Sequence, residues 1–205
     1  LLTTIAYQLD DVCYALEGSI FMAGANFQWL RDKMNFFPDV EESEELAKKA
    51  DPNANVFLIP AFVGLGAPHW IPDARGAIFG LTRDAGKEEL SLATHEAIAF
   101  QTKEIISSLE NDGVKVDSVR IDGGLTSNAF FNQILSNVIE REVLCSKTVE
   151  STALGAAYLA GIGSGEVSLK DISKNWSPKS EYNPDSSYDL GRYDIWKEFL
   201  GRLIG

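Results

Sequence analysis

Residues 119–128 read Val-Arg-Ile-Asp-Gly-Gly-Leu-Thr-Ser-Asn, and this stretch decides how the second half of the chain is organised. Apolar and polar residues alternate at its start, which predicts a strand. Gly123 and Gly124 allow positive φ and let a ligand approach a backbone that carries no Cβ. Ser127 or Asn128 can then cap a helix whose free N–H groups face the turn. Open α/β sheets bind ligands at such turns, although a tight turn that binds nothing also explains two glycines.

The glycine turn lies inside an alternating run of strands and helices, which favours parallel pairing with right-handed crossovers. The run consists of strands over 116–122 and 142–146 and helices over 127–140 and 152–163. Periodicity elsewhere predicts strands over 1–8, 12–18, 55–62 and 76–82, helices over 21–30, 89–109 and 188–203, and a polar loop over 177–187. The predicted fold class is therefore α/β, a mixed sheet with helices on its faces.

Composition narrows the classes of function. The 205 residues are 45% hydrophobic and 23% charged, as in an ordinary globular protein. The net charge of −12, with scattered Lys and Arg, excludes nucleic acid as an expected partner. No window is apolar and long enough for a membrane span, and no signal-peptide pattern occurs.

The cysteines and histidines give no sign of a metal site. Cys13 and Cys145 lack metal-ligand spacing and are expected to be free thiols in a reducing compartment. His69 is expected in a loop and His95 packed in a helix.

The chain begins with Leu1 already in strand pattern and without an initiator methionine. We therefore expect it to be the C-terminal piece of a longer polypeptide, with part of its function encoded upstream.

Residues 41–45 form an acidic run that predicts a short exposed helix, a solvated face rather than a binding site.

Two helical segments contain small residues that could serve packing or a ligand. Gly24 and Gln28 are four positions apart and therefore lie on one face of a helix. A glycine on that face is explained by the close approach of a flat ligand or of another helix. The segment 152–161 is rich in alanine and glycine, and tight helix packing is its favoured explanation.

Two neighbouring motifs connect these segments to a known family. Residues 60–70 read Pro-Ala-Phe-Val-Gly-Leu-Gly-Ala-Pro-His-Trp, and residues 73–83 read Asp-Ala-Arg-Gly-Ala-Ile-Phe-Gly-Leu-Thr-Arg. Both closely resemble the FGGY family of carbohydrate kinases, and residues 76–96 are similar to its C-terminal signature. His95 departs from the aliphatic or aromatic residue usual there. The resemblance spans residues 1–165, and the Gly-Leu-Gly-Ala-Pro-x-Trp form is similar to the glycerol-phosphorylating branch rather than to the pentose kinases.

The resemblance implies a ribonuclease-H-like domain of the actin-like ATPase fold, with residues 1–205 as the nucleotide-binding half of the enzyme. It implies ATP-dependent phosphorylation of glycerol by a full-length, cytoplasmic, homo-oligomeric protein whose Mg²⁺ is held mainly by the phosphates and the other domain. By the same resemblance Gly24 and Gln28 line the nucleotide site, Gly124 lies beneath the adenine and ribose, Gly123 is its partner in the turn, and Asn128 lies near the adenosine. Catalytic and polyol-binding residues are expected on an N-terminal domain.

Three alternatives stay open at the level of sequence. The protein could phosphorylate another polyol or sugar, or the domain could be a non-catalytic nucleotide-binding module of the actin-like superfamily. A purely structural domain would require the glycine pair, the Gly24–Gln28 face and the loop motifs to coincide by chance.

Overall fold

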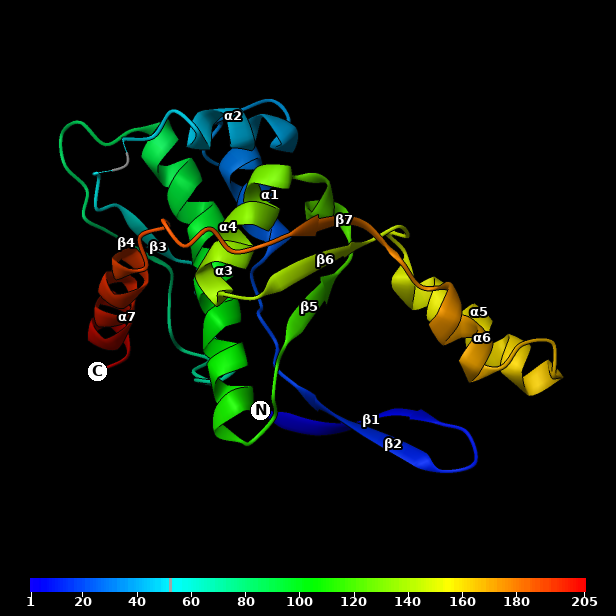
Figure 1. Cartoon of the computed structure of the whole chain (residues 1–205). Coiled ribbons are helices and arrows are strands. Elements are labelled where there is room, and N and C mark those ends of the chain that lie inside the picture. Colours follow the sequence, from blue (N-terminus) through cyan, green and yellow to red (C-terminus); the bar gives the residue numbers. More distant parts are fainter. Residues whose placement is uncertain (52) are drawn as a thin grey trace.

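A computed structural model describes residues 1–51 and 53–205 of the chain (Figure 1). The predicted hairpin is present as β1 (Leu2–Gln8) and β2 (Val12–Glu17), and a second antiparallel pair joins β3 (Phe57–Ile59) and β4 (Ala77–Phe79). A third, mixed sheet contains β5 (Ser118–Ile121), β6 (Glu142–Ser146) and β7 (Pro178–Tyr182). The α/β class predicted from periodicity is confirmed.

The core is built around a long central helix, α3 (Lys87–Asn111), against which α4 (Ala129–Ile139) packs. Glu89 caps the start of α3, because its carboxylate accepts the Gly86 N–H at 2.7 Å. Phe100 of α3 and Val138 of α4 are fully buried in one apolar cluster. Burial of this apolar surface against water is the main stabilising contribution to the layer.

The mixed sheet carries the predicted strand–turn–helix. β5 and β6 are parallel, and β7 pairs antiparallel with β6. Val143 and Cys145 are buried, and α4 contacts β6 and β7. On β5, the Arg120 guanidinium lies 3.8 Å from the centroid of the Trp176 ring, a cation–π contact.

Two elements of the tail were missed by sequence patterning. The predicted polar loop over 177–187 is wrong for 178–182, which form β7, and a further helix, α6 (Leu169–Asn175), precedes it. The β7 sequence Pro-Lys-Ser-Glu-Tyr is largely polar, so hydrophobic alternation gives no strand signal there. Its strand conformation comes from pairing with β6, which only the tertiary structure supplies.

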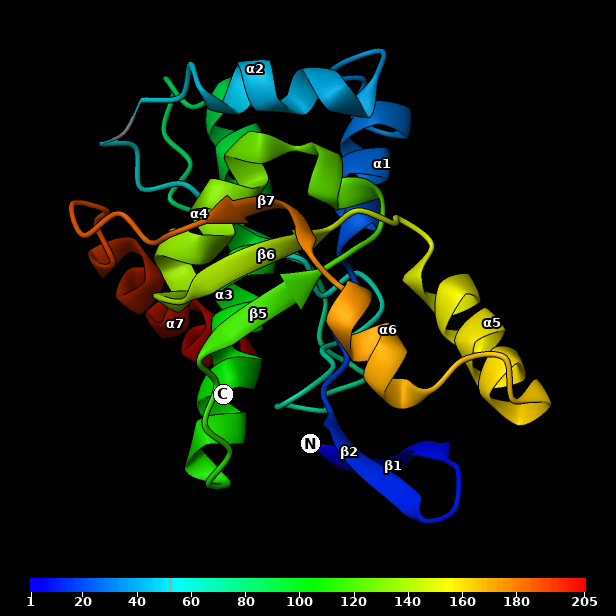
Figure 2. The same ribbon diagram turned by 45° about the vertical axis from the view of Figure 1, so that its right-hand side comes forward.

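The β1–β2 hairpin and helix α5 (Ser151–Ser164) extend from the body of the molecule (Figures 1 and 2). Ile5 and Tyr14 of the hairpin are 60% and 66% exposed. No residue of α5 is buried, so the prediction that segment 152–161 packs tightly is wrong for the part of the chain the structure describes. Among the described residues, no helix combines the length and the apolar character that crossing a lipid bilayer requires.

The last helix, α7 (Gly191–Ile204), is fixed to α3 and β3 by polar contacts inside the core. The Trp196 indole N–H donates to the Leu58 carbonyl at 2.9 Å. Arg192 reaches the buried Glu96 carboxylate through Nε and Nη2, both at 2.7 Å. Burial raises the pKa of Glu96, and the Arg192 guanidinium opposes this shift by stabilising the carboxylate.

Candidate functional site

The turn after β5 has the conformation that its glycines permit, but the two glycines differ. Gly123 takes φ of 90°, whereas Gly124 does not have positive φ and begins a 3₁₀ turn, η2 (Gly124–Ser127). The turn is closed by hydroxyl groups, since Thr126 donates to the Gly123 carbonyl at 2.7 Å and Ser127 to the Gly124 carbonyl at 2.8 Å. Positive φ therefore explains Gly123 alone.

Asn128, rather than Ser127, caps helix α4. Its Oδ1 accepts the Phe131 N–H at 2.8 Å, which satisfies one of the free donors in the first turn. The cap fixes the point where the turn becomes helix and keeps Asn128 beside the glycines. Of the two capping residues that the sequence allowed, the backbone selects the second.

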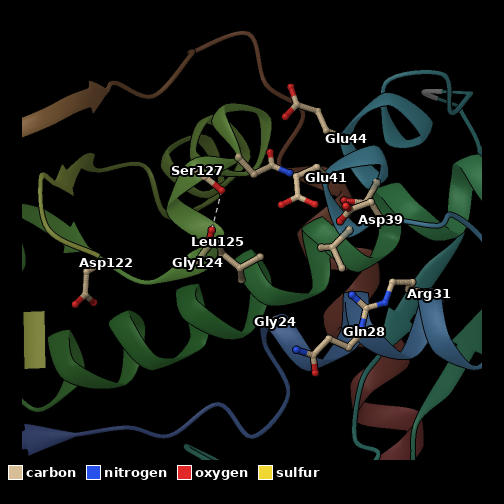
Figure 3. Close-up of a pocket in the computed structure, with 13 residues that line it drawn as sticks. Gly24, Gln28, Arg31, Asp39, Glu41, Glu44, Asp122, Gly124, Leu125 and Ser127 are labelled. Atoms are coloured by element: carbon tan, nitrogen blue, oxygen red, sulfur yellow. Dashed lines mark hydrogen bonds between the residues drawn. The ribbon is translucent and has the colours of Figure 1, made fainter. Parts of the chain in front are cut away.

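A pocket of about 560 Å³ opens between this turn and the segment that carries α1 (Gly24–Asp32), η1 (Val40–Glu42) and α2 (Ser43–Ala47) (Figure 3). Four residues predicted for the site line it together, namely Gly24, Gln28, Gly124 and Asn128. Gly123 is not among the lining residues, and it shapes the turn instead. The remaining lining residues are Arg31, Asp39, Val40, Glu41, Ser43, Glu44, Asp122, Leu125 and Ser127.

The two pocket glycines face open space. A Cβ built on Gly24 or on Gly124 would meet no atom of the described residues within 4 Å. Helix packing, which the sequence allowed as an explanation for Gly24, therefore does not require a glycine there. The absent side chains enlarge the pocket instead, as a site for a flat or bulky ligand would need.

One end of the pocket is acidic. Asp39, Glu41 and Glu44 lie on the same side of the pocket, with Asp39 next to Arg31 and Glu44 farthest from it, while Asp122 stands at the opposite end (Figure 3). The acidic run 41–45 forms short helical turns with Glu41, Glu42 and Glu45 exposed, as predicted, and Glu41, Ser43 and Glu44 also line the cavity, which the sequence analysis did not anticipate. The sequence signal that could have shown this is the spacing of Ser43 and Ala47, two small buried residues four apart that turn this face of α2 inward.

Ser43 is the lining residue with an unusual polar group. Its side chain is 1% exposed, and its Oγ has no hydrogen-bond partner among the described residues. An unpaired buried hydroxyl costs about 1–3 kcal/mol of stability, so most such groups are paired. A ligand in the pocket could supply the missing partner.

Other candidate groups lie elsewhere. His69 is in the loop as predicted, where its Nε2 lies 2.8 Å from Glu104, and that hydrogen bond raises the pKa of His69. Cys13 is half-buried, Cys145 is buried, and both are free. No cluster of three or more His, Cys, Asp or Glu side chains within residues 1–51 and 53–205 is placed to hold a metal ion.

Comparison with known proteins places this chain in a family. Residues 1–164 match the sequence profile described as the FGGY family of carbohydrate kinases, C-terminal domain. Over 207 residues the chain is 45% identical to the glycerol kinase of Alteromonas mediterranea, and the match covers 99% of this chain and 42% of that protein.

Solved structures give the same result for the fold. The structure of Plasmodium falciparum glycerol kinase with ADP matches with a TM-score of 0.86 at 34% identity, covering 100% of this chain and 42% of that one. The xylulose kinase of Lactobacillus acidophilus, with bound ligand, matches with a TM-score of 0.84 at 26% identity, covering 97% and 42%. The chain thus spans less than half the length of the relatives it matches.

Proposed function

The chain belongs to the FGGY family of carbohydrate kinases, and from this premise we propose that the full-length protein phosphorylates glycerol with ATP as the phosphoryl donor. In this proposal residues 1–205 act as the nucleotide-binding half of the enzyme, and the pocket holds the adenosine part of ATP. An N-terminal domain supplies the polyol site and the base that accepts the hydroxyl proton.

The observation that carries the proposal is the convergence of Gly24, Gln28, Gly124 and Asn128 on one cavity. These residues come from α1 and from the turn before α4, about 100 positions apart in the sequence. The cavity volume of about 560 Å³ falls in the range of small-molecule and cofactor sites. The structurally similar glycerol kinase of Plasmodium falciparum was solved with ADP, and we expect the same nucleotide to bind here.

The chemistry of the walls fits a nucleoside better than a polyphosphate. Asp39, Glu41 and Glu44 are carboxylates that can accept hydrogen bonds from ribose hydroxyls or an adenine amino group. These three carboxylates outnumber Arg31, the cation that lines this end, and repel phosphate groups, so in the proposal the polyphosphate extends away from this end of the pocket. The open faces of Gly24 and Gly124 leave room for a base and ribose.

Phosphoryl transfer depends chiefly on positioning the two substrates and on neutralising charge on the phosphates. In the proposal Mg²⁺ supplies that neutralisation and is held mainly by the phosphates and the N-terminal domain. The residues of this chain position the adenosine. The family resemblance extends the proposal to a cytoplasmic homo-oligomer.

The direct test is phosphorylation of glycerol, xylulose and gluconate by the full-length protein with Mg²⁺ and ATP. We expect glycerol to give a kcat/KM at least tenfold above the other two. Higher kcat/KM with xylulose or gluconate would make the protein another sugar or polyol kinase of the family. ADP binding without transfer to any of the three would favour a non-catalytic nucleotide-binding module.

Ser43 gives a second prediction. Replacing Ser43 with alanine removes a hydroxyl that has no partner in the described protein, so the free energy of unfolding should change by less than about 0.5 kcal/mol. ADP affinity should nevertheless fall about fivefold, because losing one hydrogen bond to the ligand costs about 1 kcal/mol of binding free energy. Isothermal titration calorimetry with ADP and urea unfolding measure the two effects.

The matched control for Ser43 is Ser91→Ala. Ser91 is also fully buried with an unpaired Oγ, but it does not line the pocket. ADP affinity should therefore be unchanged in Ser91→Ala. Equal loss of affinity in both variants would show that Ser43 acts through the fold and makes no contact with the nucleotide.

A further inference from the structure

A histidine at position 95 departs from the aliphatic or aromatic residue usual there in the family that the sequence resembles. It lies in the middle of α3 with 0% of its surface exposed. Aromatic side chains surround its ring, with Phe27 of α1 at 4.6 Å and Phe130 of α4 at 5.5 Å between ring centroids. An imidazole in such surroundings must satisfy both ring nitrogens, because an unpaired buried polar group is costly.

The hydrogen bonds of His95 determine its tautomer. Nδ1 lies 2.8 Å from the Ser91 carbonyl oxygen, which can only accept, so Nδ1 carries the proton. Burial lowers the pKa of His95 to about 4, and the ring is therefore neutral at physiological pH. Nε2 is then a hydrogen-bond acceptor that points toward the start of α4.

The group that meets Nε2 is the side-chain amide of Asn128. Its Nδ2 lies 3.3 Å from Nε2 and donates one of its two hydrogens, while Oδ1 of the same amide accepts the Phe131 N–H at 2.8 Å. The amide of Asn128 is thus held at both its oxygen and its nitrogen. The second hydrogen of Nδ2 has no acceptor in the described part of the chain, and Asn128 lines the pocket.

We propose that His95 is a positioning residue, which holds the Asn128 amide so that its remaining N–H is presented to an acceptor atom of the nucleotide base or ribose. The inference rests on the proposed function of the pocket and adds a residue outside it. An aliphatic side chain at position 95 would leave the amide nitrogen without its partner on α3, so the amide would be held through Oδ1 alone.

The test compares His95→Leu, which removes the acceptor at similar volume, with His95→Gln, whose amide oxygen can still accept. In the full-length protein His95→Leu should weaken ADP binding about three- to tenfold with the KM for glycerol unchanged, and His95→Gln should stay within about twofold of the original. Asn128→Ala should weaken binding at least as much, and adding His95→Leu to it should cause no further loss.

Ile106→Val is the control for general loosening of α3, because Ile106 is buried in the same helix but is not a pocket residue. It should leave ADP affinity unchanged. The proposal is overturned if His95→Leu binds ADP like the original protein, if His95→Gln binds as weakly as His95→Leu, or if the His95 and Asn128 losses add.

A spectroscopic measurement separates this proposal from the proposed function. Nitrogen-15 NMR of the imidazole should show the Nδ1–H tautomer, and the Asn128 side-chain amide resonances should shift in His95→Leu even without nucleotide. An Nε2–H tautomer would overturn the positioning role. If the original protein binds no ADP while these signals are present, the proposed function fails and the contact between His95 and Asn128 stands.

Discussion

Replacing Gly124 with valine should weaken ADP binding at least about 100-fold while leaving glycerol binding and the fold intact. Gly124 lines the pocket, and a Cβ at this position would meet no described atom within 4 Å, so the new side chain fills ligand space without disturbing its neighbours. The side chain takes the place of base and ribose contacts, and a 100-fold loss of ADP affinity corresponds to about 2.8 kcal/mol of binding free energy. Calorimetric titration with ADP and with glycerol measures both affinities on the full-length protein.

Gly201→Val is the matched control for Gly124. Gly201 of α7 also faces open space without positive φ, but it lies outside the pocket. Its replacement should leave ADP affinity unchanged. Equal ADP affinity in Gly124→Val and Gly201→Val would show that the nucleotide does not bind in this pocket.

Gly123→Ala should lower the free energy of unfolding instead of the ADP affinity, because a φ of 90° strains any residue that carries a side chain.

Replacing Arg192 with alanine should destabilise the fold by about 3–5 kcal/mol, the effect of leaving a buried charge without its partner. The Arg192 guanidinium makes two 2.7 Å contacts with Glu96, which is 2% exposed, and a third at 2.8 Å with the Ala54 carbonyl. Its removal leaves the Glu96 carboxylate in the core with the Tyr188 hydroxyl, 3.3 Å away, as its remaining side-chain partner, and removes the contact of α7 with the Ala54 carbonyl. Urea unfolding followed by tryptophan fluorescence measures the loss.

The control for Arg192 is another arginine of α7. Arg202 lies 4.0 Å from Glu198 in an exposed pair with side chains 67% and 71% accessible. Exposed pairs contribute about 0–1 kcal/mol, so Arg202→Ala should change stability by less than about 1 kcal/mol. Similar losses in the two variants would mean that burial does not set the value of the Arg192–Glu96 pair.

The sequence alone predicted the elements whose signals are local. Hydrophobic periodicity located the β1–β2 hairpin, α3 and the β5–α4–β6–α5 run, with ends within a few residues of those observed. The glycine pair and the polar residues after it located the turn, since positive φ and helix capping depend on a few neighbouring residues. The family motifs led from there to Gly24, Gln28, Gly124 and Asn128 as predicted site residues.

The tertiary structure decided everything that depends on distant partners. Strand β7 has a polar sequence and becomes a strand because β6 offers it backbone hydrogen bonds. Part of the acidic run of η1 and α2 lines the pocket because these elements and α1 lie opposite the turn before α4. The contact between His95 and Asn128 joins residues 33 positions apart through one hydrogen bond. Local sequence patterns report the conformation of a segment, whereas a site is formed by the side chains that packing brings together.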